Sequence, residues 1–211
     1  MLKTYLKSSI LNRFIRDEKG TAAIEFAFIA PVMVVTYFGL ASVSLLVSAD
    51  RDVSHATSVT ADLFTQSESL DGDDIEDIFN ATLAVLGLTP TQAANVTIDV
   101  ISYEMDGGGT LNEIGYTKLG SGFPSKFVPP NNISSSLINS TSGLVITRIE
   151  YEYVGSDYYK ADLTRVVSSP TLSETFMLKP RKSTTIPFSS GGSSTVSCSL
   201  ITVSGEPRAS C

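Results

Sequence analysis

The sequence has little of what most enzyme and metal sites are built from. It contains one histidine, His55, and two cysteines among 211 residues. A lone histidine with no orienting partner marked in the sequence gives no support for acid–base catalysis. Nucleophile-elbow, P-loop and metal-binding motifs are also missing from the sequence. We therefore expect no enzymatic activity, no metal and no cofactor.

One long segment of the chain lacks charge: no charged residue occurs from Phe26 to Ala49. A helix needs roughly 20 mostly apolar residues to cross the hydrocarbon core of a bilayer. This segment is long enough, and it is apolar on all sides rather than along one stripe. A cleavable secretory signal ending near Val47-Ser48-Ala49 is the alternative, but apolar segments of such signals run to about 7–15 residues. The segment therefore predicts a transmembrane helix.

The charges on the two sides of this segment predict its orientation. Residues 1–20 carry a net charge of +3, and the remaining 191 residues carry −10, which gives the net charge of −7 for the chain. Basic residues beside a span stay on the cytoplasmic side, so we expect the rest of the chain outside. The acidic remainder offers no basic stripe to bind phosphates, so we expect no nucleic-acid partner.

Glu25 is a carboxylate at the start of the apolar segment. An ionised carboxylate in hydrocarbon costs about 2–3 kcal/mol, and less near the interface, and intramembrane acids usually have a partner. If the chain were cut after Gly20, Thr21 would carry a new α-amino group one helical turn from Glu25. That amine would also lie at the positive end of the helix dipole. Two alternatives stay open: Glu25 neutralises this amine in its own chain or in a neighbouring subunit, or its carboxylate only reaches the lipid headgroups.

Residues 13–40, RFIRDEKGTAAIEFAFIAPVMVVTYFGL, resemble the N-terminus of TadE-like pseudopilins from tight-adherence (Flp-type, type IVb) pilus systems. The shared features are a basic leader, a glycine at the cut, a glutamate at the fifth mature position, an aromatic residue after it and a proline further on. In this sequence the last four are Gly20, Glu25, Phe26 and Pro31. Pro31 also removes one backbone hydrogen bond from the helix, so a kink is expected near it.

The resemblance implies a minor pseudopilin of the TadE or TadF type, which acts in assembly or initiation of a pilus. It implies cleavage by a prepilin peptidase between Gly20 and Thr21. The implied location is the bacterial inner membrane, with a single span, a cytoplasmic N-terminus and a periplasmic head. The resemblance leaves open whether the protein also enters the pilus fibre. The implied partners are the peptidase, other pilins and pseudopilins, and Tad assembly proteins. The alternative function is that of an unprocessed single-span protein whose outer domain binds something unrelated.

Hydrophobic patterning beyond the span predicts an α+β head. A helical period continues from Asp50 to Gln66, and a second helix is expected from about Asp73 to Leu86, ended by Gly87 and Pro90. Alternation then predicts an antiparallel sheet, with strands near Val96–Val100, Thr110–Lys118, Leu144–Val154 and Thr171–Phe188, the last broken by Pro180.

The expected division of the chain is a leader at 1–20, the transmembrane helix and its extension at 21–68, an α+β domain at 69–190 and a tail at 191–211. The tail is rich in serine and glycine, so we expect it to be flexible. Its two cysteines, Cys198 and Cys211, would face an oxidising compartment, and their spacing predicts a local disulfide.

Overall fold

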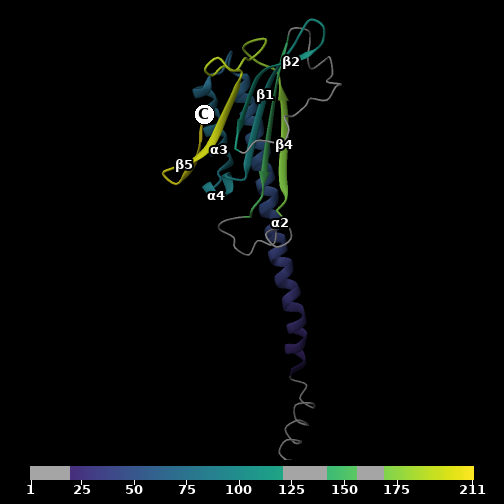
Figure 1. Ribbon diagram of the computed structural model, residues 1–211. Helices are drawn as coiled ribbons and strands as arrows, with labels where there is room; N and C mark the ends of the chain where they lie inside the picture. The colour runs from purple at the N-terminus through teal and green to yellow at the C-terminus, as the bar shows by residue number, and fades with distance from the viewer. Residues whose placement is uncertain (1–19, 121–141, 156–168) are drawn as a thin grey trace, which may run out of the picture.

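The computed structural model describes residues 20–120, 142–155 and 169–211 (Figure 1). The predicted leader, apart from Gly20, and most of the stretch between the second and third predicted strands lie outside these residues. Within the described part, one long helix carries a head made of two further helices and a six-stranded sheet. The long helix leaves the head at one end and continues alone toward the N-terminus (Figure 1). The predicted α+β class is confirmed.

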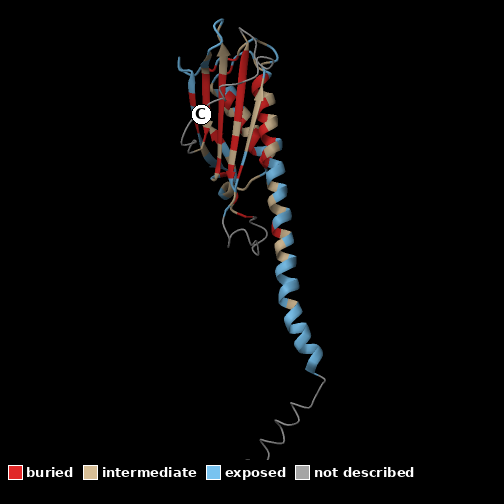
Figure 2. Cartoon of the chain, turned by 90° about the vertical axis from the view of Figure 1, so that its right-hand side faces the viewer, coloured by how far each residue is buried: buried red, intermediate tan, exposed pale blue. Residues whose placement is uncertain are grey.

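Helix α2 runs without interruption over Thr21–Thr65. Its 45 residues make it about 68 Å long at a rise of 1.5 Å per residue. The first half is exposed, whereas one side of the second half is buried in the head (Figure 2). The buried positions of this second half recur at helical spacing; they are Val53, Ala56, Thr57, Thr60, Ala61, Phe64 and Thr65. The helical extension predicted beyond Asp50 is therefore confirmed.

Helix α3 spans Gly72–Leu86 and is capped at both ends. The Asp71 carboxylate accepts a hydrogen bond from the Asp74 backbone N–H at 2.9 Å, and the Asp74 carboxylate accepts one from the Asp71 N–H at 3.3 Å. This capping box satisfies N–H groups that have no partner within the helix. Gly87 ends the helix in the left-handed conformation, with a φ of 60°. A short helix that the sequence did not predict, α4 (Pro90–Ala93), begins at the proline expected only as a stop.

The sheet has the strand order β4-β3-β1-β2-β5-β6. All neighbouring strands are antiparallel except β2 and β5, which are parallel. The strands are β1 (Val96–Met105), β2 (Leu111–Leu119), β3 (Gly143–Glu152), β4 (Thr171–Leu178), β5 (Thr195–Val203) and β6 (Glu206–Ser210). The predicted strands thus correspond to β1 to β4. The ends of β2 and β3 differ from the prediction by one or two residues, whereas β1 continues beyond Val100 to Met105.

The expectation of a flexible tail at 191–211 is wrong, because β5 and β6 belong to the sheet. The backbone of β5 pairs with β2, so that Val196 lies opposite Thr117 and Cys198 opposite Leu119. Serine and glycine bury little apolar surface, but strand pairing uses backbone groups that every non-proline residue carries. The last predicted strand also ends earlier than expected, at Leu178, because Pro180 cannot donate a backbone hydrogen bond.

The core lies between the sheet and the two long helices. Phe64 of α2 packs against Phe79 of α3 and against Phe188, with ring centroids 6.0 and 5.6 Å apart. The hydroxyls of Thr60 and Thr82 share a hydrogen bond of 2.7 Å between the helices. The buried aromatic contacts and the satisfied hydroxyls fix α2 and α3 to each other.

Gly115 of β2 provides a test of this core. A Cβ atom at Gly115 would lie 2.5 Å from Cγ and 2.9 Å from Cβ of Phe188. Rotation of the ring cannot relieve the second contact, so Gly115→Ala should lower the free energy of unfolding by about 1–3 kcal/mol through overpacking. Chemical denaturation in detergent measures this change. Gly107→Ala is the matched control, because nothing lies within 4 Å of its new methyl group; an equal loss in both variants would contradict the packing argument.

Candidate functional site

The first half of α2 is the part of the described chain that can cross a membrane. An 18-residue window of this helix has a mean hydropathy of 2.0, and only 6% of the window is buried. Exposed side chains here include Phe26, Phe28 and Tyr37, which are 68–76% exposed. Exposure of this much apolar surface to water is energetically unfavourable. The exposed apolar half of α2 therefore fits a lipid environment.

The head marks where the free part of α2 ends. Leu46 and Ala49 already pack against the core of the head, and Val53 is fully buried in it. Residues 21–45 precede these contacts with the core, although Ser42 among them is buried, and they form about 37 Å of helix at 1.5 Å per residue. The hydrocarbon core of a bilayer is about 30 Å thick. The free part of the helix is therefore long enough to span, with a short surplus at its N-terminal end.

The predicted processing site lies at the N-terminal end of α2. Gly20 is exposed and immediately precedes Thr21, the first residue of the helix. Among the described residues, no atom lies within 4 Å of a Cβ atom placed at Gly20. Cleavage between Gly20 and Thr21 remains a prediction.

Glu25 follows Thr21 by one turn on the same side of the helix. Both Glu25 and Phe26 are exposed. The pairing of Glu25 with an amine stays a prediction. Pro31 lies inside α2, which continues on both sides of it, and the kink expected there also stays a prediction.

Cys198 and Cys211 are joined by a disulfide that closes the β5–β6 hairpin. The hairpin is also held by α3, since the Ala209 N–H donates to the Asn80 side chain at 2.9 Å and the Cys211 N–H to Glu76 at 2.8 Å. Sequence reasoning found the cysteines but missed these contacts, which join residues more than 120 positions apart. The disulfide and the two hydrogen bonds fasten the end of the chain to the head.

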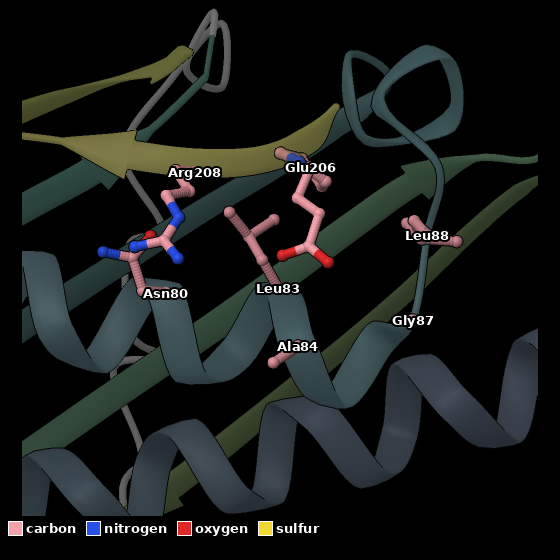
Figure 3. Close-up of a pocket in the computed structure, with 8 residues that line it drawn as sticks. Asn80, Leu83, Ala84, Gly87, Leu88, Glu206 and Arg208 are labelled. Atoms are coloured by element: carbon pink, nitrogen blue, oxygen red, sulfur yellow. The ribbon is translucent and has the colours of Figure 1, made fainter. Parts of the chain in front are cut away.

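A cleft of about 450 Å³ separates α3 from the β5–β6 hairpin (Figure 3). Asn80, Leu83 and Ala84 of α3 lie on one side of it, and Glu206 and Arg208 of β6 on the other (Figure 3). The lining combines apolar carbon with one acid and one base. It contains no nucleophile beside a general base, which is the arrangement that covalent catalysis needs.

The other face of the sheet buries an ion pair. Arg148 of β3 donates to the Asp99 carboxylate of β1 at 2.8 Å, and the Asp99 side chain is only 1% exposed. Burial raises the pKa of Tyr103 on β1 and of Tyr116 on β2, and the carboxylates of Glu113 and Asp99 raise both further. Sequence reasoning missed this polar cluster because its charged members come from different strands.

The single histidine lies apart from this cluster. His55 is exposed on α2 and borders a groove shared with β4, together with Asp62 and Arg181. Asp62 and Arg181 form an ion pair, with 2.5 Å between the guanidinium nitrogen and the carboxylate oxygen. The groove is lined largely by apolar carbon from Val59, Leu63, Phe176 and Leu178.

Among the described residues, one exposed apolar helix carries an α+β head, which fits a single-pass membrane protein whose helix is also part of the fold. The model of the TadE-like protein family matches residues 20–62, from the predicted cut to the buried half of α2. The resemblance stated from residues 13–40 is thereby confirmed, and it associates the chain with the membrane and with the Tad pilus machinery. The match covers 43 of the 211 residues and leaves the sheet outside it. A search of curated proteins found no match.

The two ion pairs of the head make a matched test of burial. Arg148→Met removes the guanidinium from the buried Asp99 carboxylate and should lower the free energy of unfolding by about 3–5 kcal/mol. Arg181→Met removes the partner of Asp62, whose side chain is 35% exposed, and should cost less than about 1 kcal/mol. Denaturant titration of the two variants measures both values. Similar losses of unfolding free energy in the two variants would mean that burial does not increase the cost of breaking the Asp99–Arg148 pair.

Proposed function

We propose that this protein is a minor pseudopilin of the TadE or TadF type, which acts in assembly or initiation of a tight-adherence pilus after a prepilin peptidase removes its leader. One observation carries the proposal: Gly20 immediately precedes the first residue of an exposed apolar helix, and Glu25 lies one turn inside it. Both residues fall within the segment that matches the TadE-like family.

Cleavage between Gly20 and Thr21 would change the electrostatics of the helix end. The new α-amino group of Thr21 would add a positive charge where the helix dipole is already positive. Within described residues, the first turn of α2 holds no acidic side chain, so Glu25 is the nearest carboxylate along the helix. Its position at i+4 lets it neutralise this amine or the amine of an adjacent subunit. Neutralisation lowers the cost of moving the helix end through apolar surroundings.

The head would remain outside the membrane and transmit force to the span. The basic leader favours a cytoplasmic N-terminus, which places the sheet in the periplasm. Because α2 is continuous from Thr21 to Thr65 and its second half is buried by the head, any displacement of the head moves the span with it. A subunit of this kind can be drawn from the bilayer into an assembly as one rigid piece.

Processing is tested by expressing the chain with and without a prepilin peptidase and sequencing its N-terminus. We expect a mature chain that starts at Thr21 only when the peptidase is present, because the bond after Gly20 is exposed. A peptidase with a mutated catalytic residue serves as control. A Met1 start in the presence of the active enzyme would contradict the proposal and favour an unprocessed single-span protein with an outer binding domain.

The role of Glu25 is tested separately from cleavage. Glu25→Ala and Glu25→Gln should still be processed but should reduce the number of assembled pili, because both variants lose the negative charge. Thr36→Ala is the matched control: Thr36 lies in the same exposed half of α2, and its hydroxyl donates only to its own helix, at the Val32 carbonyl. Electron microscopy and a count of sheared pili measure assembly. Normal piliation in Glu25→Gln would show that assembly does not need the negative charge of Glu25.

A further inference from the structure

Two apolar side chains of the head stand out from the rest of its surface. Among the described residues, the large apolar side chains that are strongly exposed lie in α2 between Ile24 and Val47, with two exceptions. The exceptions are Ile201 and Val203 of β5, at 41% and 43% exposure. They are two residues apart on one strand, so their side chains point to the same side.

These two residues lie at the end of the head from which α2 emerges. β5 is parallel to β2 and antiparallel to β6, so the β5–β6 turn lies at the same end of the sheet as the start of β1. Figure 1 shows this turn close to α4, where α2 leaves the head. At the same end, a cleft of about 220 Å³ lies between α2 and the head, and Leu45, Ala49, Leu88 and Tyr153 contribute to its lining. This end, the underside of the head, thus carries apolar side chains of β5 and α2, beside a polar cleft lined by Glu150 and Glu152.

The hairpin holds Ile201 and Val203 in an exposed position. Val203 pairs with Glu206, so only Ser204 and Gly205 form the turn, with φ values of 53° and 86°. Two residues with positive φ make the tight turn that suits a twisted hairpin. The disulfide at the other end of the hairpin and the contacts with α3 fix its base. The side chains of Ile201 and Val203 therefore cannot turn inward without breaking this pairing.

We propose that the underside of the head rests on the surface of the bilayer that α2 crosses, and that Ile201 and Val203 enter its headgroup region. The bilayer is the surface that α2 itself brings to this end of the head, since the free part of the helix ends at Leu45. Because α2 already anchors the chain, the contact forms at a high effective concentration, so even a small apolar surface contributes. Glu206 and Arg208 pair across from Val203 and Ile201, so the turn is close to neutral and the contact is apolar rather than ionic.

The contact also sets the depth of the helix. Counting back roughly 20 residues from Leu45, the length needed to cross hydrocarbon, reaches Phe26. Glu25 then lies at the opposite boundary of the hydrocarbon core, within reach of headgroups and of an amine at Thr21. The head acts as a stop that keeps this carboxylate at the boundary.

The absence of tryptophan from the chain makes the contact measurable by fluorescence. A single tryptophan is introduced as Ile201→Trp, or as Thr110→Trp at the opposite end of the head, where Thr110 is exposed beside the β1–β2 turn. The full chain is reconstituted in vesicles of phosphatidylethanolamine and phosphatidylglycerol that contain lipids brominated near the headgroup. We expect bromine to quench the Ile201→Trp variant several-fold more strongly than the Thr110→Trp variant, and aqueous iodide to do the reverse.

Further variants identify the cause of the quenching. Adding Val203→Asp to Ile201→Trp should remove most of the bromine quenching, and high ionic strength should leave it unchanged. Equal quenching in the two tryptophan variants would overturn the contact, and quenching abolished by salt would overturn its apolar nature. Unfolding midpoints verify that each variant is folded, and Val203→Trp replaces Ile201→Trp if the latter is not. The contact requires the span but neither cleavage at Gly20 nor a role in pili, so its failure and that of the proposed function are separate results.

Discussion

The burial of one side of α2 in the head is the constraint on which the other features depend. Val53, Ala56 and Phe64 are at most 1% exposed, and the same helix, without interruption, forms the exposed span. A hinge between anchor and head would let each move alone, whereas a continuous helix with a packed second half does not. The angle of the sheet, the depth of the span and the position of Glu25 are thus coupled through one rigid element.

The parts of the fold that could be predicted are those whose signal is local. The apolar period of the second half of α2 and of α3, and the alternation in β3, arise from burial of neighbouring residues on one face. The uncharged segment is recognised by its length and by apolar residues on all sides. Ile149, Tyr151 and Tyr153 alternate along the predicted strand Leu144–Val154, and all three are buried. Gly20 and Glu25 were found because a charged residue and a glycine are conspicuous at the edge of an apolar helix.

The parts that were missed depend on contacts between distant residues. β5 and β6 have a composition typical of loops, and what makes them strands is pairing with β2, the disulfide and the Asn80 and Glu76 side chains of α3. The Asp99–Arg148 pair joins positions 49 residues apart, and neither residue differs from an ordinary surface charge in the sequence. Polar contacts of this kind appear only once the strand order is known.

The two edge strands of the sheet, β6 and β4, differ in how far they are available to pair with another strand. At β6, Asn80 and Glu76 occupy backbone N–H groups that could recruit another strand. At β4 the sheet could in principle be extended by β4 of a second copy, in antiparallel fashion, about a two-fold axis perpendicular to the sheet. The strands run roughly along α2 (Figure 1), so this axis would turn the second α2 end for end. Two chains inserted the same way in one bilayer cannot meet like this, so the orientation of the anchor excludes antiparallel pairing between their β4 strands.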